Sequence, residues 1–509
     1  MTHPQAIGAL SMDQILERRW ARLLTPSLSD LFFLAVLFWV FAAGKFGWAG
    51  LLGDADAGWH IRTGQWILSH HAVPRQDLYS FSKPGAPWYA WEWLSDTIDG
   101  LLFQLAGLKG VVLMAGVVIA TFATTLIRRM VSNGSHILIA LAVALAGEGA
   151  SSIHFLARPH IFTLLLMSIS MWIIEADRRS ASRAIWVLVP ITMLWTNLHG
   201  GFLALIAVLG LTAVGSAIEG RWRGSWRYLG VTCACAAVTL VNPYGYHLHQ
   251  HVAEYLRSDW IRNVVQEFQS PSFRDESMLQ FEVLMFTGLI AAGLMFRKKQ
   301  VVEGLWVLFF AHMALSSVRH VPLYVAACAP VVALNLSEWY RTLTARAKKN
   351  SIPGILNQIA DDAARGFRHE SLWPVVVIVV LAFLNQPMHW PADFPEEIFP
   401  VKMVHDHAAD ILNVRTLTTD QWADYLIFTN PKQKVFMDGR SDFYGPEIGD
   451  QYLHATGGTW DWAKILDKYQ FQSVLLPVDR PLSQLLKMDA NWRVVEDDGK
   501  RILFVRKRE

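Results

Sequence analysis

The chain has 509 residues, of which 53% are hydrophobic and only 17% are charged, and its formal net charge is +2. This composition is too apolar for a soluble multidomain protein and is typical of a polytopic membrane protein that carries a soluble part. We therefore expect membrane lipids, and not nucleic acid, as its surroundings. The three cysteines all lie in apolar runs, so they form neither a disulfide framework nor a zinc-binding pattern.

Apolar runs predict a polytopic α-helical membrane protein of about eleven spans. A polar leader, residues 1–29, precedes the first run, whose length favours an uncleaved span over a signal peptide. Lys and Arg cluster at alternate span ends, and the positive-inside rule places those ends in the cytoplasm. The expected spans are residues 30–50, 111–127, 137–155, 161–175, 184–197, 201–218, 228–241, 279–296, 301–318, 322–336 and 372–384.

Two further parts complete the predicted organisation. Residues 51–110 form a long first outer loop within a transmembrane domain of residues 30–389, and the composition of residues 390–509 predicts a small extracytoplasmic α/β domain. Residues 345–370 carry apolar side chains at helical spacing and predict an amphipathic helix on the inner membrane surface. In the C-terminal domain we expect helices at 404–414 and 420–428 and strands at 434–438, 473–477, 493–497 and 501–507, the last two joined by a turn at Asp498–Gly499.

The first outer loop carries the strongest candidate site. Asp54 and Asp56 follow the first span directly, and two carboxylates at a membrane surface can act as a general base or bind a hard divalent cation such as Mg²⁺ or Mn²⁺. Both are candidate catalytic residues, and Asp56 is a candidate metal ligand. His60 and Glu92 lie among aromatic residues downstream, a mixture that suits a sugar. The alternative is an interfacial loop whose aspartates only cap helices.

This acidic motif, the number of spans and the C-terminal outer domain together resemble the GT-C superfamily of membrane glycosyltransferases. The resemblance implies that a sugar is taken from a polyprenyl-phosphate carrier and that Asp54 and Asp56 support catalysis. The sequence Trp460-Asp461-Trp462 differs from the WWDYG signature of the oligosaccharyltransferase branch, which argues against transfer to a peptide sequon.

Basic and amide side chains at other outer span ends suit the same chemistry. Arginine binds phosphate through two parallel hydrogen bonds, so Arg158 with His160 and Arg319 with His320 are candidates for binding the donor phosphate. Arginine at an interface can also serve only as a helix anchor. Additional candidate substrate-binding residues at this face are Asn197, His199, Asn242 and His247.

The sequence thus predicts a glycosyltransferase that moves a sugar from a polyprenyl-phosphate donor to a hydroxyl of a lipid, glycan or protein acceptor. An outer-face polysaccharide ligase or polymerase is an alternative that would not need the carboxylate pair. A transporter is a second alternative, against which the charged residues lie at span ends and not at mid-span. Short loops and the uncleaved first span favour a bacterial inner membrane, with the site facing the periplasm or the exterior.

Overall fold

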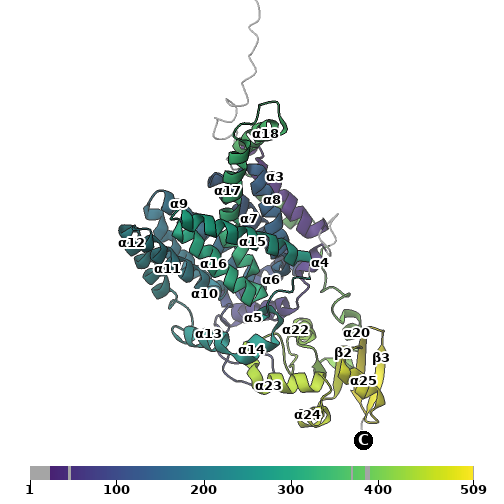
Figure 1. The fold of residues 1–509 in the computed structure, drawn as a ribbon. Helices are drawn as coiled ribbons and strands as arrows, with labels where there is room; N and C mark the ends of the chain where they lie inside the picture. The colour runs from purple at the N-terminus through teal and green to yellow at the C-terminus, as the bar shows by residue number, and fades with distance from the viewer. Residues whose placement is uncertain (1–22, 44–46, 275, 368–370, 385–389, 508–509) are drawn as a thin grey trace, which may run out of the picture.

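The computed structural model describes residues 23–43, 47–274, 276–367, 371–384 and 390–507, so residues 1–22 of the predicted leader lie outside the described residues. A bundle of helices forms the body of the molecule, and a small sheet with its own helices lies at one end (Figure 1). The helices of the bundle and its loops are α3 (Leu28–Phe38), η1 (Trp39–Ala43), α4 (Trp48–Leu51), α5 (Asp56–His70), α6 (Trp93–Ala106), α7 (Leu108–Ser132), α8 (Ile137–Ser151), η2 (Ser152–His154), α9 (His160–Arg179), η3 (Arg183–Val187), α10 (Leu188–Leu198), α11 (Phe202–Ile218), α12 (Trp222–Val238), α13 (His247–Arg257), α14 (Asp259–Val264), η4 (Gln266–Phe268), α15 (Glu276–Arg297), α16 (Val301–Ser316), η5 (Val318–His320), α17 (Val321–Thr344), α18 (Ile352–Gly366) and α19 (Trp373–Phe383).

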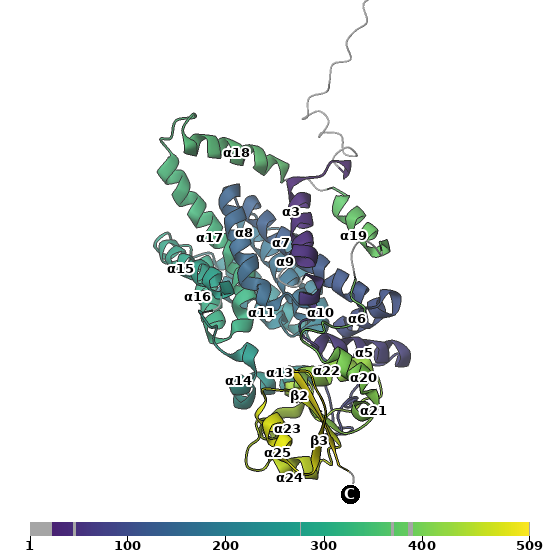
Figure 2. The same ribbon diagram turned by 90° about the vertical axis from the view of Figure 1, so that its right-hand side faces the viewer.

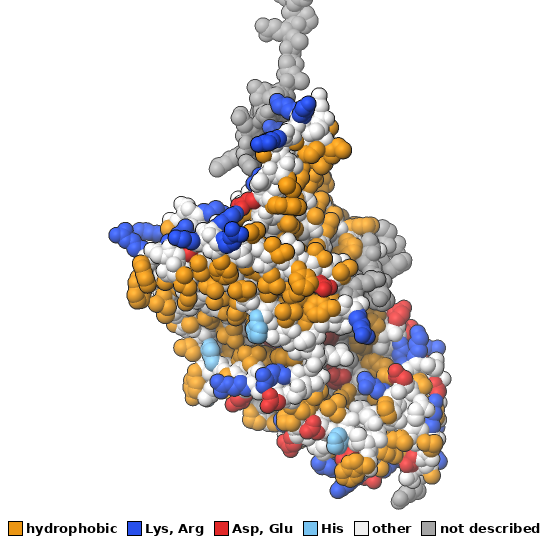
Figure 3. Space-filling model, viewed as in Figure 1, with side chains coloured by type: hydrophobic (Ala, Val, Ile, Leu, Met, Phe, Trp, Pro, Cys, Tyr) orange, Lys and Arg blue, Asp and Glu red, His pale blue; other side chains and the backbone are white. Residues whose placement is uncertain are grey.

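The bundle has the features of an integral membrane protein. In the described chain, five helices are long and apolar enough to cross a membrane, and shorter apolar helices of 10–17 residues accompany them. An apolar surface covers the middle of the molecule between two charged ends (Figure 3). The predicted count of about eleven spans is not confirmed. The expected span at 228–241, for example, lies in α12, which belongs to neither group of apolar helices.

The first outer loop is largely helical, which the sequence analysis missed. It contains α5 and α6, which cross so closely that a Cβ on Gly64 would lie 1.7 Å from the backbone oxygen of Asp96. Only glycine permits this approach. The crossing places His60 of α5 beside Asp96 of α6, with 2.6 Å between Nδ1 and Oδ1.

The C-terminal domain contains α20 (Val401–Asp406), α21 (Ala408–Ile411), β1 (Thr416–Thr418), α22 (Asp420–Thr429), α23 (Ser441–Thr456), α24 (Trp462–Lys468), β2 (Ser473–Pro477), α25 (Pro481–Met488), β3 (Trp492–Asp497) and β4 (Arg501–Arg506). The sheet order is β1-β2-β4-β3, with β1 and β2 parallel and the other pairs antiparallel. The three predicted strands β2, β3 and β4 are confirmed. The predicted strand at 434–438 is wrong, because Val435 forms only an isolated bridge with Ser80 of the first outer loop.

This bridge is part of a close contact between the C-terminal domain and the first outer loop. The guanidinium of Arg440 pairs with Asp77 of the loop at 2.9 Å, and both side chains are buried. Helix α22 packs on α5, where a Cβ on Gly58 would lie 2.8 Å from the Cβ of Phe428. The domain therefore forms a wall against the loop that carries Asp54 and Asp56.

The opposite end of the molecule carries α18 (Figure 2). This helix confirms the predicted helical segment within residues 345–370, and the side chains of Ile352, Ile355 and Ile359 on it are exposed. An exposed apolar face beside a basic loop is typical of a helix that lies on a membrane surface. Its place on the inner surface stays a prediction.

Candidate active site

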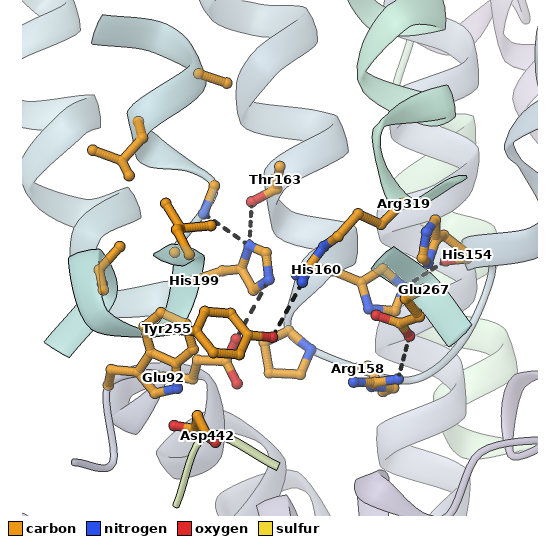
Figure 4. A pocket seen from close by; sticks show the side chains of 18 of the residues that line it. Glu92, His154, Arg158, His160, Thr163, His199, Tyr255, Glu267, Arg319 and Asp442 are labelled. Atoms are coloured by element: carbon orange, nitrogen blue, oxygen red, sulfur yellow. Dashed lines mark hydrogen bonds and ion pairs between the residues drawn. The ribbon is translucent and has the colours of Figure 1, made fainter. Parts of the chain in front are cut away.

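A cavity of about 370 Å³ lies where the membrane helices, the first outer loop and the C-terminal domain meet. Figure 4 shows side chains from many segments that point toward one another there. The structure brings together most of the predicted site residues, although they are far apart in the sequence. The predicted residues in the cavity wall are Asp56, His60, Glu92, Arg158, His160, His199, Arg319 and His320.

Arg158 holds three carboxylates together at one side of the cavity. Its Nη1 lies 2.6 Å from Oδ2 of Asp54 and 3.0 Å from Oε1 of Glu267, and its Nη2 lies 2.8 Å from Oδ2 of Asp56. Burial raises the pKa of Glu267, but Arg158 and Arg319 outweigh it and hold the pKa well below its ordinary value. Glu267 is therefore ionised at neutral pH.

Asp54 and Asp56 have different surroundings. Oδ1 of Asp54 accepts a hydrogen bond from the backbone N–H of Asp56 at 2.9 Å, so Asp54 shapes the turn that begins α5. Asp56 lies in the cavity wall, whereas Asp54 is not among the lining residues. Burial raises the pKa of the Asp56 carboxyl above its usual range, and the adjacent Arg158 opposes this rise. A carboxylate with a raised pKa is suited to accept a proton near neutral pH.

The C-terminal domain contributes Asp424 of α22 to the surroundings of Asp56. Burial and the neighbouring Asp56 raise the pKa of Asp424 well above its ordinary value, so it is a neutral acid that donates a hydrogen bond to Asp56. The backbone N–H of Gly439 donates to both oxygens of Asp424, at 3.2 and 3.1 Å. A Cβ on Gly439 would lie 2.1 Å from Oδ1 of Asp56, so glycine is required at this approach.

Glu92 lies between two histidines. Its carboxyl oxygens are 3.7 Å from Nε2 of His60 and 3.4 Å from Nε2 of His199. Burial raises the pKa of Glu92 to about 8, so the carboxyl is largely protonated at pH 7. Burial also lowers the pKa of His199 to about 3 and that of His60 well below its ordinary value, so both imidazoles are neutral.

The neutral tautomer of His199 follows from its contacts. Its Nδ1 accepts a hydrogen bond from the backbone N–H of Gly201 at 3.1 Å and lies 2.7 Å from Oγ1 of Thr163. The remaining proton is therefore on Nε2, which faces Glu92. Glu92 and the two histidines together offer donors and acceptors for hydroxyl groups.

Arg319 of η5 differs from Arg158 in its partners. Its Nη1 donates to the hydroxyl of Tyr255 at 3.2 Å, and its guanidinium lies 4.7 Å from the ring centroid of Phe268. Within the part of the chain that the structure describes, it forms no ion pair with a carboxylate inside 4 Å. Glu267 interacts with Arg319 only over a longer distance, so this half-buried guanidinium can still form a direct contact with an anion from a ligand.

The cavity also has an apolar side, built by membrane helices. Phe309, Phe310 and Met313 of α16 contribute to it, with Leu203 and Ala207 of α11. All five of these side chains are apolar. An apolar wall continuous with polar groups suits a ligand that has both a hydrocarbon part and a charged head.

Three predicted substrate-binding residues lie outside the cavity lining. Asn197 accepts a hydrogen bond from Trp93 Nε1 and donates to the backbone oxygen of Val241, so it fastens α10 to its neighbours. Asn242 accepts a hydrogen bond from the backbone N–H of Tyr244 and shapes a turn. His247 is exposed on α13 and contacts Gln250.

Sequence reasoning missed several residues that the structure brings to the site. Glu267, Tyr255 and His154 line the cavity, as does Asp442 of the C-terminal domain, which pairs with His251 at 2.9 Å. The only sequence signal for Glu267 was its place as an acidic residue in a predicted outer loop.

The proposed metal ligand Asp56 has a donor set that does not fit a divalent cation. Its carboxylate and those of Asp54 and Glu267 are bound to a guanidinium that cannot lose its charge. A cation among these oxygens would have to displace Arg158. In the described part of the chain, no group of three or more His, Cys, Asp or Glu side chains is placed to hold a metal ion.

Comparison with known proteins identifies the fold. No protein-family model matches the chain, and no curated protein matches it by sequence. The apo oligosaccharyltransferase of Archaeoglobus fulgidus is similar in structure, with a TM-score of 0.53 and 10% identity over 91% of this chain and 70% of that one. AglB of the same organism, in complex with an inhibitory peptide and a dolichol-phosphate, has a TM-score of 0.54 and 10% identity over 97% of this chain and 74% of that one. ArnT of Cupriavidus metallidurans has a TM-score of 0.49 and 12% identity over 94% of this chain and 97% of that one. The chain therefore shares the fold of these archaeal oligosaccharyltransferases, in agreement with the fold that the resemblance of its sequence to the GT-C membrane glycosyltransferases implied.

Proposed function

We propose that this protein transfers a sugar from a polyprenyl-phosphate donor to an acceptor hydroxyl at the outer face of a bacterial inner membrane. The observation that carries the proposal is one cavity that joins an apolar wall of membrane helices to the guanidinium of Arg319 and the carboxyls of Asp56 and Glu92. A polyprenyl-phosphate sugar has matching parts in the same order: a hydrocarbon chain for the apolar wall, a phosphate for the guanidinium and hydroxyl groups for the carboxyls. The acceptor is a lipid, a glycan or a protein.

Arg319 binds the donor phosphate in this proposal. Its guanidinium forms no ion pair with a carboxylate within 4 Å among the described residues, and it lies in η5, just before the outer end of α17, where a lipid head group would lie. His320 assists, because its Nδ1 faces the backbone oxygen of Met313 at 3.2 Å and its Nε2 remains for the ligand. Arg158 and His160 were predicted to share this role, but Arg158 is already bound to three carboxylates, so we assign it to positioning them.

Asp56 acts as the general base. It takes the proton of the acceptor hydroxyl while the hydroxyl oxygen forms a bond to the anomeric carbon of the sugar. The bond from that carbon to the phosphate oxygen breaks, and the electron pair stays with the phosphate, whose growing charge Arg319 stabilises. Of the two candidate catalytic aspartates, Asp56 lines the cavity and Asp54 does not, so we assign the role of base to Asp56.

Glu92, His60 and His199 bind the sugar. The neutral histidines and the largely protonated Glu92 provide hydrogen-bond donors without adding charge. Trp91 and Tyr89 in the wall provide ring faces for the apolar side of a sugar.

The test uses full-length protein in lipid nanodiscs and two readouts. In the first, a photoreactive polyprenyl phosphate, which is the product released from any such donor, labels the wild type. Labelling should fall on the order of tenfold or more in Arg319→Ala, because a charge-assisted contact to phosphate is lost. Arg257→Ala is the matched control, because Arg257 is exposed on α13 and outside the cavity lining.

In the second readout, a panel of synthetic polyprenyl-phosphate sugars is incubated with a membrane extract as acceptor. Asp56→Asn should lower transfer about a hundredfold to ten-thousandfold, the usual cost of losing a general base, while labelling persists. Wild-type protein that is not labelled, equal labelling of Arg319→Ala and the wild type, or full transfer by Asp56→Asn would each overturn the proposal.

A further inference from the structure

The carboxylate cluster around Arg158 has the composition of a divalent cation site but already contains a cation. Asp54 comes from the turn before α5, Asp56 is the first residue of α5, and Glu267 comes from η4 in a different outer loop. All three direct an oxygen at the guanidinium, at 2.6, 2.8 and 3.0 Å. Figure 4 shows Glu267 and Arg158 on this side of the cavity, joined by one of these contacts.

The guanidinium and a metal ion would compete for the same space. Hard divalent cations bind carboxylate oxygens at about 2.0–2.6 Å, so a bound ion would lie within the volume between these three oxygens. The terminal nitrogens of Arg158 contact all three oxygens. Arginine stays protonated at any physiological pH, so the guanidinium would also repel the ion.

A cluster of three carboxylates needs a positive charge for its stability. The side chains of Asp54, Asp56 and Glu267 are only 15%, 7% and 31% exposed, and like charges in such surroundings repel one another strongly. The guanidinium supplies that charge and binds two of the three carboxylates through Nη1 and the third through Nη2. It thereby fixes the position of Asp56 in the cavity wall.

We propose that Arg158 is the built-in cation of this site and that the carboxylate cluster works without a divalent metal ion. The catalytic meaning of this statement rests on the proposed function, but the occupancy of the cluster can be measured without any substrate. Removal of Arg158 leaves three carboxylates with no positive partner at their centre. We therefore expect the vacated cluster to acquire the affinity for a divalent cation that the wild type lacks.

The experiment titrates the full-length protein in nanodiscs with Mn²⁺ and follows the electron paramagnetic resonance signal of the free ion. The wild type should show no saturable binding of Mn²⁺ that depends on the cluster. Arg158→Ala should bind one equivalent of Mn²⁺, at least about tenfold more tightly than the wild type. The reason is that the substitution removes the positive guanidinium and leaves space for the ion among the three carboxylates. In the control variant Arg158→Ala with Glu267→Gln, this binding should be lost.

Arg158→Lys keeps the charge and should bind no Mn²⁺. Two results would overturn the proposal: a site for Mn²⁺ in the wild type that disappears in Glu267→Gln, or an Arg158→Ala variant that folds and still binds no ion. The wild-type titration decides the matter even if Arg158→Ala does not fold. A chelator should leave donor turnover unchanged, and failure to find any turnover would count against the proposed function and not against this assignment.

Discussion

The hydrogen bond between Asp424 and Asp56 allows the sharpest test of how the C-terminal domain acts on the site. Asp424 is fully buried, is held by the backbone N–H of Gly439 and donates to Asp56. Asp424→Ala removes that donor, whereas Asp424→Asn replaces it with an amide that can donate to Asp56 and still accept from Gly439. The two substitutions separate the loss of the hydrogen bond from the loss of the carboxyl group.

The expected size of the effect follows from the kind of bond that is lost. A hydrogen bond to a charged group contributes about 1.5–3 kcal/mol, which corresponds to roughly a tenfold to hundredfold change in rate. Asp424→Ala should therefore lower transfer by that factor. Since the bond favours the ionised form of Asp56, its loss raises the pKa of Asp56 further. Asp56 acts as a base only when ionised, so the rise of activity with pH should move to higher pH in Asp424→Ala.

The assay measures transfer from pH 5 to pH 9 together with labelling by polyprenyl phosphate and the melting temperature of each variant. Asp424→Asn should keep most of the activity and the wild-type pH profile. Asp424→Ala should also lose stability, because the buried N–H of Gly439 is left without an acceptor. An Asn variant as inactive as the Ala variant would show that Asp424 acts as an ionised carboxylate, and an unchanged pH profile in Asp424→Ala would refute the positioning role.

Three further predictions follow from other contacts. Arg319→Lys should impair donor turnover on the order of tenfold, because a single ammonium cannot replace the planar guanidinium on phosphate. Gly439→Ala should lower transfer by a similar factor, because the added methyl group displaces the carboxylate 2.1 Å away, while Gly293→Ala, with nothing within 4 Å, should have no effect. In a variant without native cysteines, an impermeant thiol reagent should label Met488→Cys in intact cells and Ser180→Cys only after permeabilisation, because the positive-inside rule places these exposed positions on opposite sides.

Each of these predictions has a result that contradicts it. Full turnover in Arg319→Lys would mean that the phosphate needs only a point charge there. Equal activity of the two glycine variants would mean that Asp56 can move without consequence. Labelling of both cysteines from outside would mean that a span had been miscounted between α9 and the C-terminal domain.

The sequence predicted those elements that a local pattern of apolar and turn residues is sufficient to identify. Strands β2 and β4 are short apolar runs, β4 follows a turn at Asp498–Gly499, and both strands were predicted. Residues 434–438 have the same appearance, yet Val435 is buried against the first outer loop and joins no ladder. A short buried run has the same composition whether it packs in a sheet or against another domain, so the sequence could not separate the two.

The candidate site was predictable to the extent that it depended on membrane topology. Arg158, His199 and Arg319 were expected at one face, and the structure brings them to one cavity. Their partners were not predictable, because Glu267 and Asp424 reach the site through tertiary packing that leaves no local spacing in the chain. This is why the sequence assigned Arg158 to a phosphate, while the structure shows it bound to carboxylates.

The docking of the C-terminal domain against the first outer loop has a consequence for the biosynthesis of the protein. Asp56 is made early and Asp424 late, and nearly all of the membrane helices are synthesised between them. The hydrogen bond between the two forms only after the last part of the chain has been synthesised, brought to the same side of the membrane as the loop and folded there. In a chain that stalls during insertion, Asp56 therefore lacks its contact with Asp424, and the cavity lacks the wall that the C-terminal domain contributes.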